Sequence, residues 1–276
     1  MTSNINGKLI DFSSPKVMGI LNITPDSFYG ASRKQTEQEI AEAVLRILEE
    51  GADIIDIGAY SSRPLAAYVE EDEEIRRLRF GLEILFREAP NATVSVDTFR
   101  SEVARCAIEE FGAAIVNDIS AGGLDTQMFE TVAKLQVPYI AMHCLGSPQT
   151  MMQYTNYGNM MQEIMLYFAE RINKLHQLGV NDIWIDPGFG FSKTTAQNYE
   201  VLRRLEEFRI FDMPLLVGFS RKTMIRDVLG TTPSESLNGT TALNMLALAK
   251  GANILRVHDV KAAVETVRLY DATCRF

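Results

Sequence analysis

The sequence predicts an α/β protein, a single-domain (β/α)8 (TIM) barrel over residues 1–276. Eight short apolar stretches rich in β-branched residues begin between positions 17 and 254, a mean spacing of about 34 residues. That spacing matches one strand–helix unit with its loops. Amphipathic stretches lie between the apolar ones, and no Pro/Gly/Ser-rich linker divides the chain. A doubly wound open sheet is the main alternative, because eight strands alone do not prove closure.

The eight stretches have the composition of fully buried strands in a parallel sheet. We expect strands at 17–23, 53–59, 93–98, 115–120, 139–144, 183–188, 214–220 and 254–259. Helices are expected at 37–50, 70–88, 101–110, 160–178 and 240–250. A glycine suited to a left-handed helix end precedes a strand at positions 51, 112, 179 and 251. We interpret the acidic run 70–74 as a solvated first turn that the helix dipole favours.

Composition narrows the function classes. The 27 Lys and Arg against 36 Asp and Glu give a net charge of −9, which argues against broad nucleic-acid or anionic-membrane surfaces. No apolar run approaches the roughly 20 residues that span a bilayer, and the first residues show no charged-then-apolar signal pattern. Three widely spaced cysteines suggest reduced thiols and a cytoplasmic location. Three histidines make a His-rich metal cage improbable.

Every expected strand ends in a polar group. In such barrels the carboxyl ends of the strands build the active site. Convergent carboxylates, amides and cations are typical of a small-molecule site. The groups are, in strand order, Asn22, Asp56, Asp97, Asn117 with Asp118, His143, Asp186, Ser220 with Arg221 and Lys222, and Arg256 with His258.

The polar groups differ in what they suit chemically. The carboxylates and amide of Asp97, Asn117 and Asp186 suit the hydrogen-bonding edge of a flat, nitrogen-rich heterocycle. A local cationic cluster on the last two strands suits a phosphate; its members are Lys222, Arg256 and His258. The side-chain oxygens of Asn22 and Asp26 are hard ligands of the kind that Mg²⁺ combines with substrate phosphates.

Two long βα loops, 22–30 and 60–66, follow the first two strands. They combine proline, glycine and hydroxyl groups with Asp26 in the first loop and Arg63 in the second. We expect both loops to lie over the carboxyl-terminal face of the barrel and to order over a charged substrate, excluding water. Ordinary βα turns are the alternative.

These residues carry a resemblance. The chain resembles the dihydropteroate synthase family, the folate-pathway enzymes that sulfonamides inhibit. The match covers nearly the whole length, and its most specific piece is MGILNITPDSF at 18–28. The supporting motifs are DIIDIG at 53–58, SVDT at 95–98, NDI at 117–119, MH at 142–143, DPGFGF at 186–191, GFSRK at 218–222 and RVHDV at 256–260.

The resemblance implies the (β/α)8 fold and a reaction. The family condenses 6-hydroxymethyl-7,8-dihydropterin diphosphate with p-aminobenzoate, releasing diphosphate and 7,8-dihydropteroate. An SN1-like loss of diphosphate with Mg²⁺ as cofactor is implied, as is a homodimer. The sequence shows no obvious catalytic base, in keeping with attack by a weakly basic arylamine on a cationic centre.

The resemblance also assigns roles to residues. Pterin and diphosphate would contact Asp97, Asn117, Asp186, Lys222, Arg256 and His258, and Asn22 would contact Mg²⁺. The p-aminobenzoate site would be lined by Phe28, Ser62, Arg63, Pro64, Phe191 and Ser220, with Lys222 beside it. Those implied to take part in catalysis are Asp26, Arg63, Lys222 and Arg256.

The chain departs from the family pattern mainly in the second loop. Where the family usually has Gly-x-Glu-Ser-Thr-Arg-Pro-Gly, this sequence carries Tyr60, Ser62 and Leu65 in place of Glu, Thr and the last Gly. Two alternatives follow. A pterin-binding methyltransferase would share the pterin pocket without needing the 22–28 loop or the cationic cluster. A non-catalytic pterin-binding paralogue would bind the pterin without positioning the amine.

Overall fold

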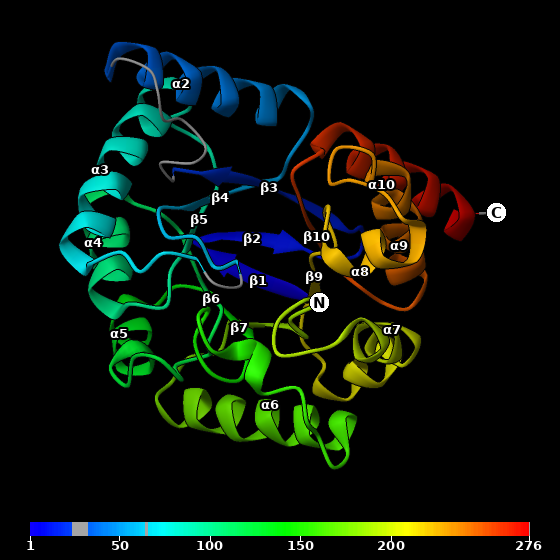
Figure 1. Ribbon diagram of the computed structural model, residues 1–276. Helices are drawn as coiled ribbons and strands as arrows, with labels where there is room; N and C mark the ends of the chain where they lie inside the picture. The colour runs from blue at the N-terminus through cyan, green and yellow to red at the C-terminus, as the bar shows by residue number, and fades with distance from the viewer. Residues whose placement is uncertain (24–32, 64–65, 276) are drawn as a thin grey trace.

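The computed structural model describes residues 1–23, 33–63 and 66–275. Eight parallel strands form the centre and the helices lie around them (Figure 1). The expected strands are all present, with ends trimmed by a few residues. They are β3 (Lys16–Asn22), β4 (Ile54–Gly58), β5 (Val94–Asp97), β6 (Ile115–Asp118), β7 (Tyr139–Met142), β8 (Ile183–Asp186), β9 (Leu216–Val217) and β10 (Ile254–Val257).

The sheet closes into a barrel. The strand order is β8-β7-β6-β5-β4-β3-β10-β9, so each strand pairs with its neighbour in sequence, and β10 pairs with β3. The two end strands also meet, because Ile185 and Leu215 form a parallel bridge and the Ile185 N–H donates to the Pro214 carbonyl at 2.9 Å. A doubly wound sheet would leave two open edges. The closed (β/α)8 prediction is therefore confirmed.

The helices occupy the expected stretches, and four further helices, α5, α7, α8 and α10, lie in stretches for which we named none. All four predicted helix-ending glycines have positive φ, for example 77° at Gly112, a conformation that costs a residue with a Cβ more than it costs glycine. The helices are α2 (Arg33–Glu49), α3 (Glu71–Glu88), α4 (Ser101–Phe111), α5 (Met128–Leu135), α6 (Met160–Gln177), α7 (Thr195–Arg203), α8 (Thr223–Leu229), α9 (Leu237–Ala249) and α10 (Val260–Arg275). Short 3-10 helices cover Met151–Gln153 and Leu205–Phe211.

The barrel interior changes character along its axis. Near the amino ends of the strands, inward side chains form an apolar layer that includes Met18, Trp184 and Leu216. Two residues further along each strand the same face recurs, and there it carries Asp56, Asn117, Asp186 and Arg256. The layer near the amino ends of the strands supplies buried apolar area. The polar layer lies at the carboxyl ends of the same strands.

An amino-terminal hairpin covers the apolar end of the barrel, and the sequence analysis did not anticipate it. Strands β1 (Thr2–Ile5) and β2 (Lys8–Asp11) pair antiparallel about Asn6 and Gly7, both with positive φ. Ile5 and Phe12 join the apolar layer, and Phe12 packs edge-on to Trp184 with ring centroids 5.3 Å apart. An Asn-Gly pair after an apolar residue is a strong hairpin signal that would have revealed it.

Among the described helices, none combines the length and the apolar character that crossing a membrane requires.

Phe12→Ala should destabilise the barrel without touching its polar layer. Removing the ring leaves a cavity against Trp184, so we expect a loss of about 3 kcal/mol in the free energy of unfolding. Urea unfolding followed by tryptophan fluorescence measures it. Leu9→Ala, on the same hairpin but 68% exposed, is the control and should change little. Equal effects of the two substitutions would contradict a packing role for Phe12.

Candidate active site

The centre of the polar layer is an ion-pair network. Arg256 on β10 reaches across the barrel; its Nε lies 2.6 Å from Asp56 Oδ2 and its Nη2 lies 2.6 Å from Asp97 Oδ2. Asn117 Nδ2 on β6 donates to the same Asp56 oxygen at 3.1 Å. The Asp56 side chain is fully buried and that of Arg256 is 19% exposed. Four strands, β4, β5, β6 and β10, are thus joined at one point by polar contacts.

The network carries more negative than positive charge and is largely removed from water. Burial raises the pKa of Asp97 to about 7, against the opposing charge of Arg256 and with a further contribution from Asp56. Burial also disfavours the charge of Arg256, but Asp56 and Asp97 outweigh this and hold its pKa above the ordinary value. The site therefore holds a permanent cation beside a carboxyl group that titrates near neutral pH.

Two polar atoms of the interior lack a hydrogen-bond partner among the described residues. They are Asp56 Oδ1 and Ser95 Oγ, on adjacent strands and paired in register. A buried polar atom without a partner costs roughly 1–3 kcal/mol. A ligand or water that donates hydrogen bonds at this depth would recover that cost, which points to a polar occupant.

A second cation lies across the mouth of the barrel. The Lys222 Nζ donates to the Phe189 carbonyl at 2.6 Å and lies 4.8 Å from the centre of the Phe191 ring. Burial lowers the pKa of Lys222 to about 8, although the nearby Asp186 opposes the shift. Asp186 accepts the Gly188 N–H at 2.7 Å, and burial raises its pKa against the charge of Lys222.

His258 and Ser220 form a hydrogen-bonded pair at the ends of the last two strands. Ser220 Oγ accepts the backbone N–H of His258 at 3.2 Å and lies 2.9 Å from its Nδ1. The tautomer of the ring decides whether Nδ1 or the Ser220 hydroxyl is the donor in this contact. Partial removal from water and the charges of Arg256 and Arg221 lower the pKa of His258. The ring is neutral at pH 7, so of the expected cationic cluster only Lys222 and Arg256 carry charge.

The remaining predicted residues are placed as follows. Asn22 is half-buried at the end of β3, Ser62 is half-buried in the loop after β4, and Arg63 is exposed there. The charge of Arg63 contributes to lowering the pKa of His258, so it belongs to the same electrostatic neighbourhood. Phe191 and Ser220 lie beside Lys222 and His258 respectively. Asp26, Phe28, Pro64 and Leu65 fall outside the described residues.

Two strand-end residues turn away from the site. Asp118 faces outward, where its Oδ2 accepts the Tyr139 hydroxyl at 2.6 Å. His143 is buried behind the barrel wall, 2.9 Å from Lys193 Nζ through its Nδ1. Lys193 is 2% exposed and also donates to the Gly188 and Phe191 carbonyls, each at 3.2 Å. It therefore shapes the loop that carries Phe191, a role that the sequence analysis missed because a lysine in a loop normally indicates exposure.

The prediction that the acidic run 70–74 is a solvated first turn is wrong for one of its residues. Glu74 is not a solvated first-turn residue, because its side chain is buried, 2.5 Å from Arg100 Nη1, and accepts the Thr98 hydroxyl at 2.8 Å. Helix α3 packs that face against α4 and the barrel, so only part of the run meets water. Arg100, just beyond the Ser-Val-Asp-Thr motif, is the residue in the sequence that could have indicated a cationic partner for Glu74.

The fold and the site together define a (β/α)8-barrel protein with a buried, hydrogen-bonding small-molecule site at the carboxyl ends of its strands. The model of the pterin binding enzyme family matches residues 18–258, and the chain belongs to that family.

Named relatives agree with this assignment. The dihydropteroate synthase of Escherichia coli K12 is 40% identical, over 97% of this chain and 94% of the relative. The Yersinia pestis dihydropteroate synthase, solved in complex with a sulfonamide drug, matches with 37% identity, 100% coverage of both chains and a TM-score of 0.91. The Xanthomonas albilineans enzyme with 4-aminobenzoic acid matches with 36% identity and a TM-score of 0.92, covering 100% of this chain and 98% of that one.

Arg256→Met should destabilise the protein most where the carboxyl groups are ionised. Without the guanidinium, Asp56 and Asp97 are buried without a cation, which costs about 3 kcal/mol of unfolding free energy. The pKa of Asp97, already raised by burial, then has no opposing cation to lower it, so the loss is present at pH 8 and shrinks as pH falls to 5.5 and Asp97 protonates.

Urea unfolding at the two pH values measures the effect. The control is Arg221→Met, whose cation pairs with Asp259 and is 40% exposed; we expect less than about 1 kcal/mol and little pH dependence. A pH-independent loss in Arg256→Met would contradict the buried-charge account.

Proposed function

We propose that this chain is a dihydropteroate synthase, which condenses 6-hydroxymethyl-7,8-dihydropterin diphosphate with p-aminobenzoate to give 7,8-dihydropteroate and diphosphate. The observation that carries the proposal is the Asp56–Arg256–Asp97 network with Asn117, set at the carboxyl ends of the strands in a chain 40% identical to a named synthase. It is an alkyl transfer in folate biosynthesis.

The pterin ring is bound deep in the barrel. Asp97, Asn117 and Asp186 offer carboxylate and amide groups that match the alternating donors and acceptors of a pterin edge. Lys222 supplies a cation on the same side, and Arg256 stacks beside the ring. The unpartnered Asp56 Oδ1 and Ser95 Oγ are consistent with a ligand that donates hydrogen bonds at this depth.

The diphosphate is held at the mouth of the barrel by Arg256 and His258. The His258 ring offers an N–H donor, and an approaching anion favours its protonation. Asn22, half-buried at the end of β3, offers one hard amide oxygen, which fits a Mg²⁺ ion completed by diphosphate oxygens and water. Such an ion, when bound, neutralises diphosphate charge. The described residues contain no cluster of three His, Cys, Asp or Glu that would hold a metal by itself.

The chemical step follows from these charges. The bond between the exocyclic methylene carbon and the diphosphate oxygen breaks, and its electron pair leaves with the diphosphate. The pterin spreads the resulting positive charge, which the nearby carboxylates of Asp97 and Asp186 stabilise. The arylamine nitrogen then forms the C–N bond and loses a proton. Asp26 helps the first loop close over this centre.

The p-aminobenzoate site lies toward the second loop. Phe191 offers a ring face, Ser220 and Lys222 offer hydrogen-bond donors, and Ser62 and Arg63 approach from the loop. Phe28 and Pro64 complete the lining. Sulfonamides resemble this substrate, so we include the chain among their targets. A sulfonamide complex of the related Yersinia pestis enzyme supports that inclusion.

We also propose a cytoplasmic homodimer. Apolar side chains are exposed on three neighbouring helices, α8, α9 and α10, and would be covered in a dimer; they are Val228, Leu229, Leu237, Leu246 and Leu269. Cys106 and Cys144 are buried and free, and Cys274 is exposed and free, in keeping with a reducing compartment. The net charge of −9 disfavours nucleic-acid partners.

A coupled assay tests the proposal. Purified protein, Mg²⁺, the pterin diphosphate and p-aminobenzoate are combined, and dihydropteroate and diphosphate are followed. We expect production that requires every component, including the metal. Binding of the pterin diphosphate without turnover would favour the non-catalytic paralogue instead.

The pKa of Asp97 predicts a pH dependence of pterin binding. The carboxylate accepts hydrogen bonds from the ring, so binding should weaken as pH falls through about 7 and the group protonates. We expect 6-hydroxymethylpterin, which lacks the diphosphate, to bind about tenfold more weakly at pH 5.5 than at pH 7.5. Calorimetry measures it. Asp97→Ala should abolish binding at both values. An affinity for 6-hydroxymethylpterin that does not change with pH, or that is unchanged in Asp97→Ala, would contradict the assignment of Asp97 to the pterin site.

A further inference from the structure

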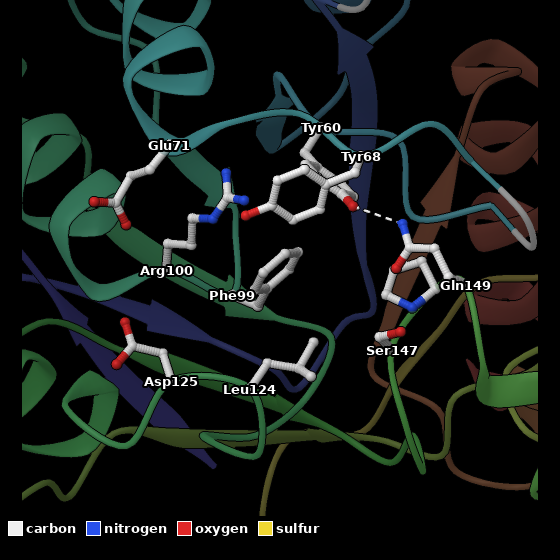
Figure 2. Close-up of a pocket in the computed structure, with 10 residues that line it drawn as sticks. Tyr60, Tyr68, Glu71, Phe99, Arg100, Leu124, Asp125, Ser147 and Gln149 are labelled. Atoms are coloured by element: carbon white, nitrogen blue, oxygen red, sulfur yellow. Dashed lines mark hydrogen bonds between the residues drawn. The ribbon is translucent and has the colours of Figure 1, made fainter.

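The second loop is tied to the opposite rim of the barrel by one side chain. Gln149, in the segment after β7, donates from Nε2 to the Tyr60 hydroxyl at 2.8 Å (Figure 2). The same Nε2 donates to the Ala66 carbonyl at 3.1 Å. Tyr60 and Ala66 stand on either side of Ser62 and Arg63. One amide therefore holds both ends of the segment that approaches the amine site.

The hold on Ala66 reaches Arg63 directly. The Ala66 N–H donates to the Arg63 carbonyl at 3.1 Å. At the other end, Tyr60 follows β4 closely, and Ser61 and Ser62 come directly after it. Displacing either anchor would therefore move the backbone that carries Ser62 and Arg63.

Gln149 is itself held in place. Its segment is a turn in which the Ser147 N–H donates to Thr150 Oγ1 at 3.0 Å and the Thr150 N–H donates to the Ser147 carbonyl at 2.9 Å. The loop is thus fastened to an ordered point on another βα connection.

The Tyr60 ring rests on a rigid support. It packs edge-on against Phe99, with ring centroids 5.1 Å apart, and the Arg100 guanidinium lies 5.4 Å from its centre (Figure 2). Arg100 cannot move freely, because it pairs with buried Glu74 and donates to the Val69 carbonyl at 2.7 Å. The aromatic contacts set the plane of the ring, whereas the hydrogen bond sets where its hydroxyl end lies.

A pocket of about 380 Å³ lies beside the ring, although Tyr60 itself is only 6% exposed (Figure 2). Its lining includes Tyr60, Tyr68, Phe99, Pro148 and Gln149. Side chains beside such a space have room to change rotamer, since no neighbouring atoms oppose them. The hydroxyl–amide bond therefore fixes the hydroxyl end of the ring beside this space, while the aromatic contacts hold the ring itself.

We propose that the Tyr60–Gln149 hydrogen bond positions Ser62 and Arg63 for p-aminobenzoate. Tyr60 and Gln149 would then affect the affinity for p-aminobenzoate and not the affinity for the pterin. This inference rests on the proposed synthase function. It also gives Tyr60, which stands where the family pattern has Glu, a specific role: its neutral hydroxyl accepts a hydrogen bond from a neutral amide.

Tyr60→Phe and Gln149→Leu test the proposal by steady-state kinetics with each substrate varied in turn. Tyr60→Phe, which loses one hydrogen bond, should raise the KM for p-aminobenzoate about three- to tenfold. Gln149→Leu, which also loses the bond to Ala66, should raise it at least as much. The KM for the pterin diphosphate should stay within about twofold, and so should 6-hydroxymethylpterin affinity. In the double variant, Tyr60→Phe should add no further effect, because Gln149→Leu has already removed the bond.

Two controls make the same chemical changes beside the bridge. Tyr68→Phe removes a hydroxyl from the neighbouring ring, which is 63% exposed, and Gln153→Leu alters an exposed glutamine of the following 3-10 helix. Both should leave each KM unchanged. Tyr60→Phe keeps the ring and its stacking, so it decides the question even where Gln149→Leu folds poorly.

The outcomes separate the two levels of inference. If the unmodified protein binds the pterin diphosphate but forms no dihydropteroate, the proposed function fails. If it is active and Tyr60→Phe leaves the p-aminobenzoate KM unchanged, or raises both KM values equally, the positioning role fails while the function stands. Additive effects of the two substitutions would likewise overturn the shared bond.

Discussion

The ion pairs of Arg256 with Asp56 and Asp97 constrain the whole carboxyl end of the barrel. A guanidinium and two carboxylates can be withdrawn from water together only because each offsets the desolvation of the others. The cation must reach across the barrel to do so, which ties β10 to β4 and β5. It also leaves one carboxyl with a pKa near neutrality and one buried oxygen without a partner. The pocket is thus charged, rigid and incomplete without a polar ligand.

The apolar half of the barrel supplies stability that offsets the cost of such a buried polar pocket. The inward layer at the amino ends consists of apolar side chains that include Trp184, Ile5 and Phe12, and the Trp184 N–H is satisfied by Ser3 Oγ. Outward residues of the same strands pack against the surrounding helices. Cohesion is therefore concentrated away from the polar layer, and the loops above that layer are free to serve binding. This separation is a general property of the barrel.

The loops are secured by contacts between βα connections that are distant in sequence. Lys193 joins the loop after β8 to His143 at the end of β7. Gln149 joins the loop after β4 to the segment after β7, and Glu74 fixes Arg100 beneath the same loop. In each case a side chain that would ordinarily be solvated is buried or bridged. These contacts determine the shape of the loops around the substrates, whereas the barrel determines only where the loops begin and end.

The sequence by itself determined the eight strand–helix units, their order along the chain and the polar residues at the strand ends, because these depend on local patterns. A buried apolar run predicts a strand, a glycine predicts the helix end, and a carboxylate where the run stops predicts the mouth of the barrel. Even the hairpin that was missed had a local signal at Asn6 and Gly7. Closure, the outward turn of Asp118 and His143, the burial of Glu74 and Lys193, and the Tyr60–Gln149 bond were decided by the tertiary structure alone. Each of these features depends on which side chain, distant in sequence, contacts the residue in the folded chain. The exposure and the charge of a residue depend on that contact as well as on the type of the residue.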